Sequence, residues 1–187
     1  MNELYYIYFM VSKTPTRFGG LIRKVGKSKY NHSSIGLDEE LKELYGFART
    51  QHNIIFLGGL MLENMDRYTL RKSDYVDVVI FKVPVTLEQY TWVKETVNRV
   101  HHDEEYMYNL FSVLSYPITH GFETYKAYTC VEFVMHILEY LGYQPPYPAY
   151  RCKPDDLLIL LKDYIFYQGN LLDYCKRDDF EIGRAHV

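Results

Sequence analysis

The sequence predicts an α+β fold in which a small antiparallel sheet packs against a helix that carries a cysteine. Apolar runs of strand length follow one another in the first part of the chain. Further along, two threonines each precede an apolar stripe of helical spacing. The chain contains no repeat, low-complexity tract or linker. We therefore expect a single domain over residues 1–181.

Composition and charge exclude several classes of protein. The chain has 187 residues and a mass of 22.3 kDa, which suffices for one complete hydrophobic core. Hydrophobic residues make up 48% and charged residues 24%, which excludes a disordered tail or a fibrous repeat. The formal net charge of −3 argues against nucleic acid as a partner, because general nucleic-acid binders are strongly basic.

The strands are expected at five places. The β-branched run Val76–Val83 is nearly continuous and predicts a central strand that Pro84 ends. The run Leu4–Met10 predicts a buried first strand, which is followed by a turn-rich stretch at Thr14–Gly20. The other strands are expected at His32–Leu37 and Glu43–Arg49, as a hairpin around the turn Asp38–Leu41, and at Leu60–Leu62.

Helices are expected mainly in the second half. Thr86 and Gln89 form a capping box that begins one helix. A last helix is expected after Pro154, with acidic residues in its first turn. The segment Tyr106–Tyr128 is expected to be mostly loop.

A second capping box places a cysteine at the start of a helix. Thr129 and Glu132 match the S/T-x-x-E pattern, and Gly142 is placed to end the helix after Leu141. Cys130 then occupies the first helical position, where unpaired amide groups and the positive end of the helix dipole lower the pKa of a thiol. An inert buried thiol is the alternative, but it is more common in the body of a helix. We interpret Cys130 as a candidate nucleophile if a base lies beside it.

His32 is the best candidate for that base. It begins a predicted strand, and the small residues around it leave room for another element or for a substrate. A purely structural histidine is the alternative reading. His52 and His120 are expected in loops, and His136 points away from the stripe that contains Cys130.

These residues resemble a known family. Tyr-Asn-His-Ser-Ser-Ile-Gly-Leu at 30–37, Leu-Tyr-Gly-Phe-Ala-Arg at 44–49, Gly-Gly at 58–59 and Tyr-Thr-Cys-Val-Glu-Phe-Val at 128–134 are similar to segments of the circularly permuted NlpC-type papain-like cysteine hydrolases. YiiX-like proteins and lecithin–retinol acyltransferase are relatives in that group. Its histidine strand precedes its cysteine helix, which catalysis permits because the groups need only meet in space.

The resemblance implies roles for particular residues. Cys130 would be the nucleophile and His32 the general base, while a third polar residue would orient the histidine. Glu63 and Glu43 are the two candidates for that third residue. The backbone N–H of Cys130 would bind the oxyanion, with help from the hydroxyl of Tyr128 or Tyr125. Val131 replaces the serine that commonly follows the family's cysteine.

Several features indicate where the protein works and what surrounds the site. The cysteines Cys130, Cys152 and Cys175 lie far apart without a CxxC pair, which favours reduced thiols and a cytoplasmic location over disulfides. The run Leu4–Val11 is too short to span a membrane, so no integral membrane segment is expected. Between residues 13 and 29 there are six basic residues and no acidic one. We read this stretch as a solvated face, with an anion site beside a cleft as the alternative.

The last six residues, 182–187, look foreign to the chain. Ile-Gly-Arg-Ala-His-Val resembles the translation of a sequencing-adapter oligonucleotide, so we expect a non-native tail.

The predicted function is a thiol-dependent amidase or peptidase that needs no metal or organic cofactor. The substrates compatible with this chemistry are a peptide, a cell-wall fragment or a lipid ester. The alternatives are a lipid acyltransferase of the same fold and a non-catalytic binding module that retains the cleft.

Overall fold

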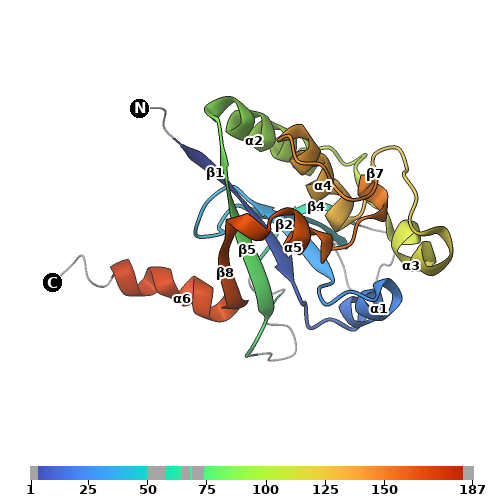
Figure 1. The fold of residues 1–187 in the computed structure, drawn as a ribbon, viewed down its shortest axis with the longest axis horizontal. Helices are drawn as coiled ribbons and strands as arrows, with labels where there is room; N and C mark the ends of the chain where they lie inside the picture. The colour runs from blue at the N-terminus through green and yellow to red at the C-terminus, as the bar shows by residue number, and fades with distance from the viewer. Residues whose placement is uncertain (1–3, 50–57, 65–67, 69–73, 183–187) are drawn as a thin grey trace.

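The computed structural model describes residues 4–49, 58–64, 68 and 74–182, and its centre is a six-stranded antiparallel sheet (Figure 1). The strands lie in the order β4-β3-β2-β1-β5-β8. Their bounds are β1 (Tyr5–Ser12), β2 (His32–Gly36), β3 (Leu44–Arg49), β4 (Gly58–Leu62), β5 (Asp77–Val85) and β8 (Ile165–Asn170). Each neighbouring pair is antiparallel, so the mixed α+β class and the antiparallel sheet are confirmed.

Helices surround this sheet. They are α1 (Arg17–Gly26), α2 (Leu87–His102), α3 (Leu110–Thr119), α4 (Cys130–Tyr140), α5 (Asp156–Leu160) and α6 (Leu171–Ile182). A short parallel pair, β6 (Met107–Tyr108) and β7 (Ala127–Tyr128), flanks α3. The 3-10 turns η2 (Ala149–Arg151) and η3 (Lys162–Tyr164) lie on either side of α5. Within the described ranges, no helix is long and apolar enough to cross a membrane.

The central strands β1 and β5 are buried on both faces, which explains their continuous apolar runs. Odd-numbered residues of β1, such as Phe9, pack with α2 and α4 in the larger core cluster. Even-numbered residues, such as Met10, pack in a second cluster with Leu171 and Tyr174 at the start of α6. A strand that is covered on both faces does not alternate between apolar and polar residues. β1 and β5 pair with each other at the middle of the sheet, as the sequence predicts for Val76–Val83.

Both capping boxes predicted from sequence are present. Thr86 caps α2 with Gln89, and Thr129 caps α4 with Glu132. Helix α4 ends as expected, because Gly142 has a φ of +93°, a backbone conformation that favours glycine.

The expected turn at Thr14–Gly20 is wrong in part, because α1 begins within it. Thr16 caps the helix by accepting a hydrogen bond from the N–H of Gly19 at 2.9 Å. Gly19 serves close packing instead of a turn, since a Cβ there would lie 2.5 Å from Asn31 Nδ2. The glycines and the proline of this segment predicted a turn, but the Thr16 cap and the close packing at Gly19 stabilise a helix.

The expected loop at Tyr106–Tyr128 is also wrong in part. It contains α3, which Asn109 caps through the N–H of Ser112 at 3.0 Å. Pro117 lies inside this helix, near its end. The helix predicted after Pro154 is present only as the short α5, and the chain continues into β8 and α6, which the sequence did not indicate. Residues 183–187 of the suspected tail lie outside the described residues.

Candidate active site

Cys130 lies at the buried start of α4. The N-terminal turn is held by reciprocal bonds: Thr129 Oγ1 accepts from the N–H of Glu132 at 3.1 Å, and Glu132 Oε2 accepts from the N–H of Thr129 at 3.0 Å. The cysteine is only 7% exposed, and α4 packs against β2. The thiol therefore sits at the positive end of the helix dipole and away from bulk water, where that field is least screened.

His32 meets Cys130 from the first position of β2. The imidazole and the thiol lie close enough to influence each other's pKa, and both are almost completely buried. The Nε2 atom of His32 contacts the Glu63 carboxylate. Because Nε2 is engaged there, Nδ1 is the ring nitrogen left for the thiol. The structure thus brings together sulfur, imidazole and carboxylate from distant parts of the chain.

Glu63 follows β4 directly and is held on all sides. Its backbone N–H donates to Leu44 O at 2.7 Å, which continues the β3–β4 ladder by one residue. One carboxylate oxygen, Oε1, faces His32, while Oε2 accepts hydrogen bonds from Ser34 at 2.8 Å and from Tyr68. These contacts on both oxygens hold the Glu63 carboxylate in one orientation.

Gly46 on β3 makes room for this contact. Glu63 has to reach from the end of β4 across β3 to His32 on β2. A Cβ at position 46 would lie 2.9 Å from His32 Nε2 and would also collide with Glu63 Oε1. Only glycine leaves this path open, so the glycine of the Leu-Tyr-Gly-Phe-Ala-Arg segment has a direct role in assembling the site.

The electrostatics favour a thiolate and an imidazolium. Burial alone opposes a charged imidazolium, but the Glu63 carboxylate and the contact with Cys130 outweigh it and raise the pKa of His32 to about 9. Burial likewise opposes a thiolate, yet His32 and the backbone of Ser33 lower the pKa of Cys130 below its ordinary value. These opposite shifts describe an ion pair, as expected for an activated cysteine and its base.

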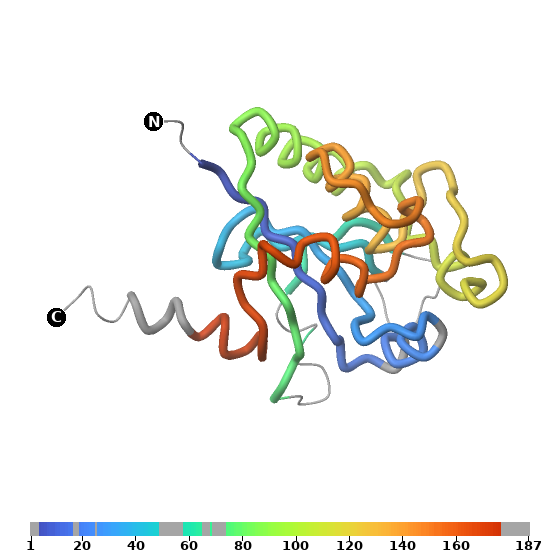
Figure 2. The backbone as a smooth tube through the Cα atoms, viewed as in Figure 1, coloured from blue at the N-terminus to red at the C-terminus, as the bar shows by residue number. Residues whose placement is uncertain are grey.

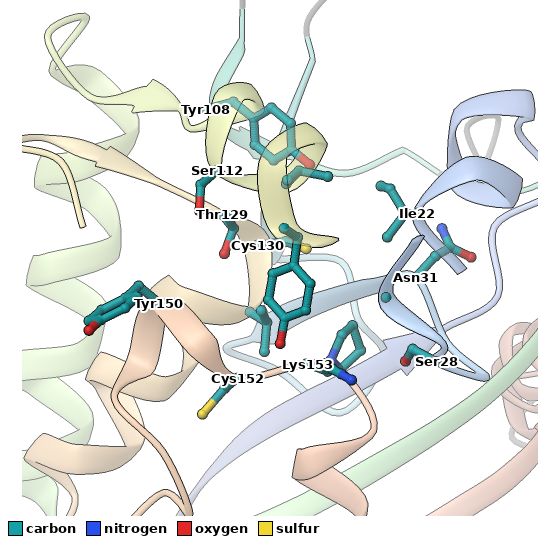
Figure 3. A pocket seen from close by; sticks show the side chains of 15 residues that line it. Ile22, Ser28, Asn31, Tyr108, Ser112, Thr129, Cys130, Tyr150, Cys152 and Lys153 are labelled. Atoms are coloured by element: carbon teal, nitrogen blue, oxygen red, sulfur yellow. The ribbon is translucent and has the colours of Figure 1, made fainter. Parts of the chain in front are cut away.

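A pocket opens at Cys130 between α1 and α3 (Figure 3). Its volume is about 550 Å³, including the part open to solvent. The lining is mainly apolar and aromatic, with a few polar groups. It comprises Ile22, Gly26, Ser28 and Asn31 from the α1 side, Tyr108, Ser112, Val113 and Tyr116 from the α3 side, and Thr129, Cys130, Val131, Tyr150, Cys152, Lys153 and Pro154.

Cys152 gives an internal comparison for Cys130 because it lines the same pocket. It is 3% exposed, and its Sγ donates to Tyr147 O at 3.4 Å. Burial raises the pKa of this thiol to about 12, since no histidine offsets the loss of hydration. The two thiols share one pocket but have pKa values that are shifted in opposite directions.

Three residues that the sequence proposed for the site lie elsewhere. Glu43 lies opposite Leu37, beyond the end of β2, and its carboxylate is 3.8 Å from Lys94 on α2, whereas Glu63 is the glutamate that contacts His32. Tyr125 is 86% exposed in the loop after α3, and Tyr128 packs against Phe47, so neither lines the pocket.

Other histidines stay apart from the thiol. His120 follows α3 with a φ of +56°, and His136 Nδ1 lies 3.0 Å from Glu139 on the outer side of α4. His52 and His186 lie outside the described residues. Among the described residues, no group of three or more His, Cys, Asp or Glu side chains could hold a metal ion.

Sequence reasoning missed several residues around the pair. Ser33 and Ser34 directly follow the histidine in the sequence, and that adjacency was a usable signal. Tyr68 donates a hydrogen bond to Glu63, five residues earlier in the chain, and no pattern in the sequence indicates it. Asn31 is fixed by hydrogen bonds from Arg23 at 2.6 Å and to Thr14 at 2.5 Å, which depend on the unexpected helix α1.

Comparisons with protein-family models, with curated proteins and with solved structures find no match for this chain.

Proposed function

We propose that this protein is a thiol-dependent hydrolase, an amidase or peptidase, with a permuted papain-like fold. The observation that carries the proposal is the buried row Cys130–His32–Glu63, whose cysteine lines a pocket. A cysteine activated by a histidine, which is itself oriented by a carboxylate, is the arrangement used for nucleophilic attack on a carbonyl.

In the first half of the reaction, the Cys130 thiolate attacks the carbonyl carbon of an amide or ester. A C–S bond forms, and the negative charge moves to the carbonyl oxygen. The backbone N–H of Cys130 belongs to the first turn of α4, where amides have no intrahelical acceptor, so it is placed to bind this oxyanion. Protonated His32 then donates its proton to the leaving amine or alcohol, and an acyl-enzyme remains.

In the second half, neutral His32 accepts a proton from water as the water attacks the thioester. The C–S bond breaks, the acid product leaves, and His32 again holds the proton opposite the thiolate. Glu63 stabilises the imidazolium and keeps Nε2 occupied throughout. Its role is positional and electrostatic, and it exchanges no proton in this scheme.

A lipid acyltransferase of the same fold is the second candidate. The mainly apolar lining of the pocket favours it, because an acyl chain would lie against Ile22, Val113 and Tyr116. In that case an amine or alcohol acceptor takes the place of water. A non-catalytic binding module has less support, because Glu63 contacts His32 where an orienting residue of the site would stand.

Trapping of the acyl-enzyme tests the proposal. Wild-type protein is mixed in parallel with activated esters of short peptides and of fatty acids, and the intact mass is measured after rapid acid quench. We expect an adduct that maps to Cys130, that Cys130→Ala abolishes and that Cys152→Ala retains. A peptidyl adduct that water discharges supports the amidase, and a fatty-acyl adduct that persists until an amine is added supports the transferase. No adduct with either donor, or an adduct that survives in Cys130→Ala, would contradict both.

A further inference from the structure

Apolar side chains are exposed at the end of the molecule where α1 and α3 lie. They belong neither to the core clusters nor to the lining of the pocket. Helices α1 and α3 contact each other and lie together at the end opposite α6 (Figures 1 and 2). The ten residues of α3 include no charged side chain. On this helix Ile118 is 85% exposed, Phe111 64% and Leu114 45%.

The exposed residues of α3 form one stripe. Positions 111, 114 and 118 are spaced by three and four residues, so they share a face of the helix. Ser112, Val113 and Tyr116 lie on the other side and line the pocket at Cys130. Helix α3 therefore separates the pocket from an apolar outer surface. Tyr125, in the loop that follows, adds a ring that is 86% exposed.

Helix α1 adds positive charge to the same end. The stretch from Lys13 to Lys29 holds six basic residues and no acidic one, in a chain whose net charge is −3. Arg23 donates a hydrogen bond to Asn31, and the Lys29 ammonium lies 3.1 Å from Asp77. Lys24 and Lys27 are both exposed to solvent. Exposed positive charge is thus present on the segment that contacts α3, against the sign of the whole molecule.

We propose that this α1–α3 end docks on an anionic lipid surface. Apolar side chains next to lysines are the pattern of helices that lie in a membrane interface, with the apolar face among the acyl chains and the cations at the headgroups. Exposed tyrosine is also enriched at that depth. The solvent-exposed lysines favour an anionic surface over a neutral one. Docking places the pocket, which opens between the same two helices, next to the lipid. The proposal does not depend on Cys130 chemistry.

Vesicle sedimentation tests the docking. Full-length protein is mixed with vesicles of phosphatidylcholine and phosphatidylserine in equal parts, and separately with vesicles of phosphatidylcholine alone. We expect sedimentation with the anionic vesicles, little with the neutral ones, and a loss of binding as salt is added. The Cys130→Ala protein should bind as the wild type does, so the outcome is separate from that of the hydrolase test.

Two matched pairs of variants locate the surface. Leu114→Gln/Ile118→Gln should weaken binding on the order of tenfold or more, while Leu87→Gln/Ile159→Gln, which changes exposed apolar residues of α2 and α5, should not. Lys24→Gln/Lys27→Gln should weaken binding on the order of 30-fold, because each lysine near an anionic surface contributes about fivefold. Lys42→Gln/Lys162→Gln removes the same charge from other exposed positions and should have little effect.

Three results would overturn the proposal. Wild-type protein that stays in solution with anionic vesicles excludes a lipid surface as the occupant. Equal loss of binding in the test and control pairs would place the contact elsewhere. The third result is a protein that does not bind vesicles but forms a concentration-dependent dimer. If Leu114→Gln/Ile118→Gln dissociates that dimer, the stripe contacts a second copy of the chain.

Discussion

Helices α2 and α4 begin with the same local geometry but lie in different surroundings. In both, a threonine hydroxyl accepts from the N3 amide at 3.1 Å, and the N3 side chain accepts from the cap amide at 3.0 Å. The first residue of α2, Leu87, is 56% exposed, whereas Cys130 at the start of α4 is 7% exposed. The local sequence sets where each helix begins. Packing against β2, which carries His32, is what makes one of these ends a candidate for chemistry.

The third helical residue shows the same contrast. Gln89 of α2 is partly exposed, while Glu132 of α4 is fully buried, and its Oε1 lacks a hydrogen-bond partner among the described residues. Burial raises the pKa of Glu132 to about 7. The same capping role is therefore filled by a neutral amide at one helix and by a carboxyl group that titrates near neutrality at the other.

Replacement of His32, the proposed base, should have the largest effect on the reactivity of the thiol at the start of α4. We expect His32→Gln to slow acyl-enzyme formation about 10³-fold, because proton transfer and the stabilisation of the thiolate are lost together. Stopped-flow kinetics with an activated ester measures it. His136→Gln, a histidine on the outer side of α4, is the control and should leave the rate unchanged. Similar losses in both variants would mean that the helix, and not the imidazole, is disturbed.

An exchange of the two N3 residues sharpens the comparison. The folded-state pKa of Glu132 is raised from 4.5 to about 7, so its contribution to stability is present below pH 4.5 and is lost as the pH rises through 7. Relative to Glu132→Gln, the wild type should lose about 3 kcal/mol of unfolding free energy across this range. Urea titrations at several pH values measure the difference. Gln89→Glu places a carboxyl group at the more exposed cap, and the unfolding free energy of this variant should show no comparable dependence on pH. A flat wild-type profile would show that Glu132 stays ionised.

Replacement of Gly46, which lies against the His32–Glu63 pair, should have the next largest effect on activity. Gly46→Ala places a methyl group against both side chains, and we expect it to slow ester cleavage on the order of tenfold and to destabilise the fold by about 1–3 kcal/mol. Gly20→Ala in α1 is the control, since its Cβ would meet only Arg23 at 3.8 Å. Thermal unfolding and the rate are measured on both. Full activity in Gly46→Ala would show that the His32–Glu63 contact does not need the space that Gly46 leaves.

Loss of the caps should have the smallest effect on stability. Thr86→Ala and Thr129→Ala each remove one hydrogen bond and should each cost about 1 kcal/mol. Only Thr129→Ala should also lower the reactivity of the Cys130 thiol, because the cap fixes the amides around the sulfur. Chemical denaturation and alkylation rates separate the two effects. Equal thiol reactivity in Thr129→Ala and wild type would show that the helix end contributes little to activation.

Much of the fold could be predicted because its signals are local. Threonine caps, the positive-φ glycine after α4 and the apolar run of β5 each depend on a few neighbouring residues. Helix α1 was missed because Gly19 and Gly20 suggest a turn unless the packing of Asn31 is known. Strand β8 was missed because it is an edge strand whose pairing with β5, far earlier in the chain, alone makes it a strand.

The candidate site, like the fold, could be predicted only where its signals are local in the sequence. Cys130 and His32 could be named because a capping box and a short motif mark them. Glu63 and Glu43 could not be separated from sequence alone, since the choice depends on strand register and on the space above Gly46. Tyr68 and the tyrosines of the pocket reach the site only through tertiary folding.

The alkylation of Cys130 and Cys152 as a function of pH tests most directly whether the start of α4 activates its thiol. Iodoacetamide is added in pulses between about pH 5 and pH 9, and peptide mass spectrometry gives a rate for each cysteine. We predict that Cys130 reacts faster than Cys152 over the whole range, because the pKa of Cys130 is lowered while burial raises the pKa of Cys152 to about 12. A Cys130 rate that is no faster than the Cys152 rate at about pH 6 would contradict the account.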